Sequence, residues 1–258
     1  MKKILFSLVA LVASMSMNAQ VMKVMKNGQD TPVETYYGSD YYVVFEEAPA
    51  APASASWTKL TGKDDWDPSG DAYGKSVIIV TEAAAKPAGA TELNDEGTVW
   101  VRIEGDNCYI ETVAKKIVAT SMYVTFAACK ITASSNLDKI DVSGVTSFEY
   151  CFANCSDATA IDVSSWNISS TANTDCMFRC CYNLESLTLN NTFHASDNGN
   201  MFGEVGMRLT ESNKCVVYGV TDEAVKTNLK GSSDVDPMFG EDGTGWYGWD
   251  TKIKFDGE

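Results

Sequence analysis

A Phe-x-x-Cys motif occurs three times in this chain, at a constant interval of 26 residues. The copies are Phe126-Ala-Ala-Cys129, Phe152-Ala-Asn-Cys155 and Phe178-Arg-Cys-Cys181. A period of this length is typical of a solenoid, in which each repeat forms one coil and buries its apolar side against the next. The six motif residues Phe126, Cys129, Phe152, Cys155, Phe178 and Cys181 are therefore predicted to form the core of the repeats.

Each motif is followed by a run with the pattern apolar-x-x-apolar-x-apolar. The runs occupy residues 137–142, 158–163 and 184–189. This pattern is that of the strand in a leucine-rich-type repeat. The predicted fold class is a β-rich α/β solenoid: a short leucine-rich-type repeat array of about three coils, preceded by small β units and closed by a C-terminal helix.

Alternation along these strands selects candidate binding residues. Solenoids usually present surfaces for binding, and side chains between the inward apolar positions of a strand point outward. The candidates are Asp138, Lys139 and Asp141 in the first run, Thr159 and Asp162 in the second, and Glu185, Ser186 and Thr188 in the third.

The chain divides by composition into six segments. Two lysines and a short apolar stretch at the start predict a secretory signal peptide, and a Pro- and Ala-rich stretch predicts a linker. The segments are the signal peptide 1–19, a small N-terminal β unit 20–47, the linker 48–56, a β-rich segment 57–119, the repeats 120–220, and a capping helix with C-terminal tail 221–258.

Local patterns predict further elements outside the repeats. Residues 75–81 form a β-branched strand, and residues 98–104 and 108–113 alternate on either side of a Gly-Asp-Asn turn, as in a β-hairpin. Residues 215–220 are predicted as a closing strand. Thr221 is the predicted N-cap of a helix over 224–229, because two acidic residues follow it.

The charge and hydropathy of the chain restrict where the protein can be located and which molecules it can bind. The chain carries 20 basic and 35 acidic residues, a net charge of −15, which repels nucleic acid. No later segment is long and apolar enough to span a membrane, and no cysteine closely follows the apolar start to carry a lipid anchor. The protein is expected to be secreted or at the cell surface. The oligomeric state is left open.

Eight cysteines in an exported chain would suggest disulfides. The repeat register favours another interpretation for three of them, because Cys129, Cys155 and Cys181 should stack as small buried apolar residues. Disulfides among the remaining five stay open, with Cys108 and Cys215 expected outside the stack.

The longest stretches of the repeat resemble a known family. Residues 166–181, Trp-Asn-Ile-Ser-Ser-Thr-Ala-Asn-Thr-Asp-Cys-Met-Phe-Arg-Cys-Cys, are similar to a surface-protein repeat written W-D-T-S-N-V-T-N-M-S-Y-M-F-Y-N-C, and residues 143–155 match its later part. The chain thus resembles BspA-like leucine-rich-repeat proteins, a class that includes a mycoplasma surface-repeat family of unknown function. The resemblance implies a secreted or surface-exposed bacterial protein that adheres to host matrix or to other microbes. Here the array is short, and its strands carry Ile and Val where Leu is usual.

Metal and cofactor chemistry has little support in the sequence. Asp65, Asp67, Ser69 and Asp71 resemble the front of an EF-hand calcium loop, but its twelfth position is Ser76 where a bidentate glutamate is needed. They remain a weak calcium candidate, with an acidic turn as the alternative. No cofactor is predicted.

Catalysis has little support either. The only histidine, His194, is interpreted as an exposed loop residue because no Ser or Cys lies in a nucleophile-elbow context. Trp246, Tyr247 and Trp249 could form a sugar-stacking platform, or pack against the domain.

We therefore predict a non-catalytic recognition or adhesion protein that binds a protein or glycan on a host or neighbouring cell. Two alternatives stay open. One is a structural spacer or assembly subunit without a ligand. The other is a carbohydrate-active enzyme that uses carboxylates between residues 57 and 120.

Overall fold

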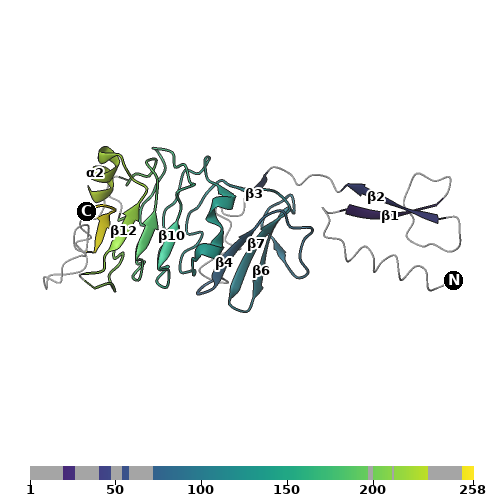
Figure 1. Ribbon diagram of the computed structural model, residues 1–258, viewed down its shortest axis with the longest axis horizontal. Coiled ribbons are helices and arrows are strands. Elements are labelled where there is room, and N and C mark those ends of the chain that lie inside the picture. The colour runs from purple at the N-terminus through teal and green to yellow at the C-terminus, as the bar shows by residue number, and fades with distance from the viewer. Residues whose placement is uncertain are drawn as a thin grey trace. The chain divides into compact units, whose positions relative to one another are not determined.

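A computed structural model of the protein describes residues 20–26, 41–47, 54–57, 72–196, 200–210, 212–231 and 252–258. The expected signal peptide, the calcium candidate Asp65–Asp71 and the aromatic residues Trp246, Tyr247 and Trp249 lie outside these ranges. The chain forms two compact units, Met1–Ala51 and Pro52–Glu258. In the first unit, β1 (Gln20–Lys26) and β2 (Tyr41–Glu47) pair antiparallel along their whole length (Figure 1).

The second unit begins with β3 (Ala55–Trp57), which pairs in parallel with β8 (Ile117–Ala119). Ala55 and Ser56 therefore belong to a strand, although their composition predicts linker. The strand forms here because the small side chain of Ala55 is buried and its N–H donates to the carbonyl of Lys116 at 2.9 Å.

A four-stranded sheet precedes the repeats, in the order β4 (Ser76–Val80), β7 (Asn107–Thr112), β6 (Val99–Glu104) and β5 (Thr91–Glu92). β6 and β7 are antiparallel neighbours, which confirms the predicted hairpin, and β4 runs parallel to β7. Beyond β4 the pairing continues into the first repeat, where the N–H of Val77 donates to the carbonyl of Lys130 at 3.1 Å.

The repeats contribute short parallel strands. β8 pairs with β9 (Ile140–Asp141), and a second sheet has the order β10 (Ala160–Asp162), β11 (Ser186–Thr188), β12 (Cys215–Tyr218) and β13 (Ile253–Phe255). Figure 1 shows the strands of this second sheet side by side. The register matches Ile161 with Leu187, 26 residues later, so the spacing of the sequence motif is also the spacing of the strands. The central row of Ile161, Leu187, Val217 and Phe255 is buried.

The first apolar run is mostly not a strand. Residues 133–139 form two 3₁₀ turns, η1 (Ala133–Ser135) and η2 (Leu137–Lys139), and only Ile140 and Asp141 are extended. The turns accommodate the extra residues between Cys129 and the strand. Asn136 joins them in the left-handed region, with φ 53°, and its side chain donates to the carbonyl of Ile79 at 3.0 Å.

The motif phenylalanines form one aromatic stack through the core. Ring centroids are 5.5 Å apart for Phe126 and Phe152, 5.5 Å for Phe152 and Phe178, and 5.9 Å for Phe178 and Phe202. All four rings are buried. Backbone bonds keep the same register: the N–H of Phe152 donates to Met177 and that of Phe178 to Met201. The core of the second unit therefore runs continuously from repeat to repeat.

Two positions of each repeat adopt a left-handed backbone without glycine. Val124, Tyr150 and Cys176 have φ between 52° and 56°, and Ala128, Asn154 and Cys180 between 56° and 62°. Five of these residues donate their N–H to a carbonyl of the next repeat, namely Val124, Ala128, Tyr150, Asn154 and Cys180; the N–H of Ala128, for example, donates to Ala153 at 2.7 Å. The strain of the left-handed conformation is thus offset by backbone hydrogen bonds between repeats.

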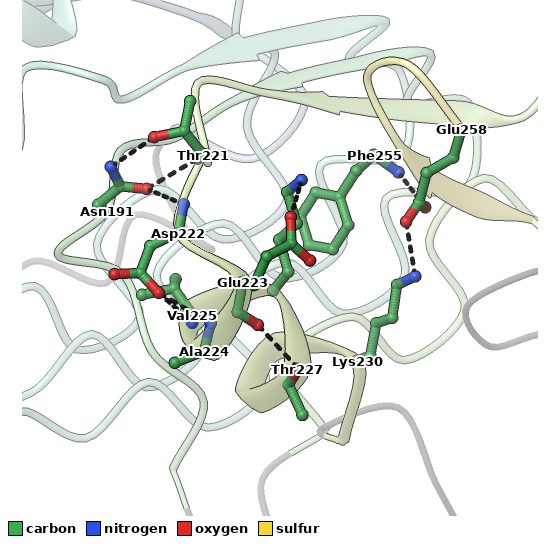
Figure 2. A network of polar contacts seen from close by, with 11 residues as sticks. Asn191, Thr221, Asp222, Glu223, Ala224, Val225, Thr227, Lys230, Phe255 and Glu258 are labelled. Atoms are coloured by element: carbon green, nitrogen blue, oxygen red, sulfur yellow. Dashed lines mark hydrogen bonds and ion pairs between the residues drawn. The ribbon is translucent and has the colours of Figure 1, made fainter.

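The helix α2 (Glu223–Gly231) covers the C-terminal end of the second sheet (Figures 1 and 2). Its N-cap is Asp222, whose carboxylate accepts from the N–H of Ala224 at 2.8 Å, so the predicted cap at Thr221 is wrong. The N–H of Thr221 donates instead to the side chain of Asn191 at 2.8 Å. Asp222 is preferred because its carboxylate also interacts favourably with the positive end of the helix dipole.

The edge of β13 is closed by the residue Glu258. Lys252 O and Asp256 N face β12, so the N–H and C=O of Phe255 point to the other side. The Glu258 carboxylate accepts from Phe255 N at 3.1 Å, and Glu258 N donates to Phe255 O at 3.2 Å. The same carboxylate bonds Lys230 of α2 at 2.8 Å, as Figure 2 shows.

Candidate binding surface

The eight predicted binding residues all lie outside the core. Asp138, Thr159, Asp162 and Glu185 are exposed, and the remaining four are half-buried: Lys139, Asp141, Ser186 and Thr188. Strand register brings part of this set together, since Asp162 is the partner of Thr188 and Ala160 that of Ser186. β9 is not paired with β10 in the described sheets, so the first run is not part of the same sheet.

The same outward rows continue beyond the three predicted runs. Thr188 is paired with Tyr218, and Ser186 with Val216, which in turn is paired with Lys254. Tyr218 is 38% exposed. We call this surface the strand face; it consists of Ala160, Asp162, Ser186, Thr188, Val216, Tyr218 and Lys254. The alternation of residues 215–220 was the signal that could have identified its last part.

Two of the predicted acids shape turns. Asp141 accepts a hydrogen bond from the N–H of Ser143 at 3.0 Å, and this bond is the main reason that the pKa of Asp141 is lowered. Asp162 accepts in the same way from Ser164, from its N–H at 3.0 Å and its hydroxyl at 2.7 Å. Both carboxylates therefore hold the turn after their strand.

A hollow joins the first two runs. It has a volume of about 310 Å³ and lies between the 3₁₀ turns and β10, with Asn136, Asp138, Ala160 and Asp162 among its lining residues. Asp138 is held beside it by an ion pair with Lys139 at 3.4 Å. The candidates of the first run thus meet the strand face at its β10 edge.

His194 is half-buried, not exposed as predicted. Its Nε2 lies 3.0 Å from the carbonyl oxygen of Ala172, and no Ser or Cys side chain bonds to it among the described residues. Its Nδ1 is buried without a hydrogen-bond partner in the described part of the chain. The ring is half-buried because it bridges the turn that precedes β11 and the turn that follows it. Without a Ser or Cys partner in the described residues, His194 does not form a nucleophile–base pair.

No disulfide joins the eight cysteines, all of which are described. Seven are buried, Cys108 and Cys215 among them, and Cys180 is half-buried. The thiol of Cys155 donates to the carbonyl of Phe126 at 3.1 Å, and that of Cys181 to Phe152 at 3.3 Å. Burial raises the pKa of Cys155 well above that of an ordinary thiol. The repeated thiols thus bond to the motif phenylalanine of the preceding copy.

The described ranges lack both a metal-binding cluster and a membrane-spanning helix. They contain no cluster of three or more His, Cys, Asp or Glu side chains placed to bind a metal ion. They also contain no helix with the length and hydropathy needed to cross a membrane.

Residues 113–214 match a protein family described as "Mycoplasma protein of unknown function, DUF285". The matched stretch contains all three Phe-x-x-Cys motifs and ends just before β12. This family is related to the BspA-like surface-repeat proteins. No curated protein and no solved structure matches the chain.

Proposed function

We propose that the repeats form a short leucine-rich-type solenoid of the BspA-like kind, and that the protein is exported and recognises a protein or glycan on a host or neighbouring cell without catalysis. The 26-residue register of β10 and β11 and the continuous phenylalanine stack support the solenoid. The family similarity over residues 113–214 supports a bacterial surface protein.

One observation carries the recognition role. The strand face is regular because its strands pair in register, yet several of its polar groups make no polar contact within the described part of the fold. The side chains of Ser186, Thr188 and Tyr218, and of neighbouring Thr159 and Glu185, make no hydrogen bond or ion pair in the described part of the chain. Parallel strands hold these groups in fixed rows, which lowers the entropy cost of binding.

The charge of the chain restricts the partner. With a net charge of −15, the protein repels polyanions and attracts basic or neutral surfaces. The partner proposed here is therefore a basic protein region or a neutral glycan.

The two alternatives have weaker support. Assembly through the sheet edge is opposed because Glu258 occupies the outward backbone groups of Phe255. A carboxylate enzyme is opposed by the acids of β6 and β7: Glu104 and Glu111 both bond to Arg102. Both carboxylates are thus already paired with a cation of the same sheet, which leaves neither side chain free for a substrate.

Binding of residues 20–258 to arrays of host matrix proteins and glycans, with and without calcium, tests the proposal. The binding variant combines Thr188→Ala on the strand face with Thr159→Ala and Glu185→Ala directly beside it. The matched control combines Glu96→Ala and Thr146→Ala, which change exposed residues elsewhere. We expect saturable binding that the first variant weakens at least about tenfold and the control leaves unchanged. Binding to no array component, together with self-association in sedimentation, would favour the spacer.

A further inference from the structure

A second hollow shares no residue with the strand face. Its volume is about 430 Å³. We call it the tyrosine groove and define it by Tyr73, Lys130, Asn154, Ser156, Asp157 and Tyr182. Lys130, Ser156 and Tyr182 each directly follow the cysteine of one Phe-x-x-Cys motif, so the repeat stacks three different side chains along the groove.

Tyr73 is the most exposed large apolar side chain of the described residues, at 68%. Its backbone is nevertheless fixed. Ala72 before it is fully buried, and the N–H of Gly74 after it donates to the carbonyl of Ala128 at 2.9 Å. The fold therefore holds an aromatic ring in water at the rim of the groove, where it contributes little to stability.

Tyr182 also lines the groove, and its ring is held in place. The Arg208 guanidinium lies 5.0 Å from the centre of the Tyr182 ring, and Arg208 N donates to Tyr182 O at 3.0 Å. The phenol bonds to Cys180, which raises the pKa of Tyr182 and keeps it neutral. The groove therefore combines an exposed ring with a fixed ring.

Polar groups of the groove carry both charges and remain unused. The ammonium of Lys130, the amide of Asn154, the hydroxyl of Ser156 and the carboxylate of Asp157 have no side-chain hydrogen bond or ion pair within the described ranges. They supply donors and acceptors together, which suits a ligand that both donates and accepts. A purely cationic or anionic ligand would meet one like charge.

We propose that the tyrosine groove binds a neutral oligosaccharide. A pyranose ring has an apolar C–H face that stacks on an aromatic ring, here Tyr73, and hydroxyls that each donate and accept. Asp157 and Asn154 accept from these hydroxyls, and Lys130 donates to them. Sulfated or sialylated glycans are disfavoured by the acidic chain. This inference rests on the proposed recognition function and adds a site for one ligand class.

Three exposed tyrosines allow a matched test on residues 20–258. Tyr73 is in the groove, Tyr218 is on the strand face, and Tyr123, which is 51% exposed, is in neither. Each is changed to alanine, and binding is measured on an array of neutral and sialylated oligosaccharides. Asp157→Asn is the polar variant of the groove. Circular dichroism checks that every variant keeps the fold.

If the groove is the site, the parent binds neutral oligosaccharides, Tyr73→Ala weakens this binding at least about tenfold, and Asp157→Asn weakens it several-fold. Tyr123→Ala and Tyr218→Ala leave it unchanged. Loss of glycan binding only in Tyr218→Ala overturns the groove and assigns the glycan to the strand face. Absence of glycan binding in the parent overturns the groove as well. The proposed function is then judged by the matrix-protein array alone.

Discussion

The aromatic rings of Phe152 and Phe178 lie 5.5 Å apart between centroids, with planes only 2° from parallel. Phe152 also stacks on Phe126 at 5.5 Å and on Trp166 at 5.6 Å. It therefore contacts three other buried rings in two neighbouring repeats. A side chain in this position links the packing of one repeat to that of the next.

Phe152→Ala is expected to lower the free energy of unfolding by about 3–5 kcal/mol, because it leaves a cavity in the middle of the stack. Tyr123→Ala removes an exposed ring and should change it by less than about 0.5 kcal/mol. Urea unfolding followed by circular dichroism measures both. Equal losses in the two variants would show that the stack does not dominate the core.

The phenylalanine stack could be predicted from the sequence because it is determined by the constant spacing of the Phe-x-x-Cys motif. Copies of one motif at equal intervals place equivalent side chains at equivalent positions, as Phe126, Phe152 and Phe178 show. The hairpin and the strand β12 were accessible for a related reason, since strand alternation is a local pattern.

Other features depend on contacts that no local pattern encodes. Val124 and Tyr150 adopt left-handed backbones because neighbouring repeats supply hydrogen bonds, whereas propensity predicts glycine there. The tyrosine groove joins Tyr73 to Tyr182, more than 100 residues apart. The 3₁₀ turns around Asn136 replace a strand because the side chain of Asn136 bonds to Ile79 in another sheet.

Gly219 is required by a close backbone contact at the end of β12. Its φ is +80°, and a Cβ there would lie 2.2 Å from the carbonyl oxygen of Leu189. Gly219→Ala is therefore expected to destabilise the protein by about 2–4 kcal/mol, through strain and displacement of the Leu189 backbone. A Cβ at Gly144 meets nothing within 4 Å, so Gly144→Ala should be close to neutral. Thermal unfolding of the two variants compares them directly; a stable Gly219→Ala protein would contradict the contact.

The cysteines should differ sharply in reactivity. Cys180 is half-buried, whereas the other seven are buried. Burial raises the pKa of Cys180 as well as those of Cys129 and Cys151, so exposure to the reagent decides the order. Because the thiolate is the reactive form, iodoacetamide at pH 8 should first modify Cys180 in the folded protein. Peptide mass spectrometry after timed labelling measures the order, and labelling in denaturant should modify all eight. Cys180→Ser should remove the fast site. Early modification of Cys155 would be inconsistent with the burial of its thiol.

The closed edge at Glu258 should make stability depend on pH. The bond from Lys230, and then that from the N–H of Phe255, lower the pKa of Glu258. A carboxyl group whose pKa is lowered by folding stabilises the fold fully at pH values above its pKa in the unfolded chain, about 4.3. This stabilisation is lost as the pH falls through the lower pKa of the folded chain. The side chain is 39% exposed, so we expect the contribution to be below about 1 kcal/mol.

Glu258→Gln tests this dependence, because it removes the charge at every pH. At pH 7 the variant should unfold at a lower urea concentration than the parent, and the difference should shrink as pH falls from about 5 to about 3, where Glu258 of the parent becomes neutral as well. Asp256→Asn removes an exposed charge two residues away without touching Lys230 or Phe255, and at pH 7 its free energy of unfolding should stay within about 0.5 kcal/mol of the parent. A Glu258→Gln difference that is the same at pH 7 and pH 3 would show that the ion pair with Lys230 does not stabilise the edge.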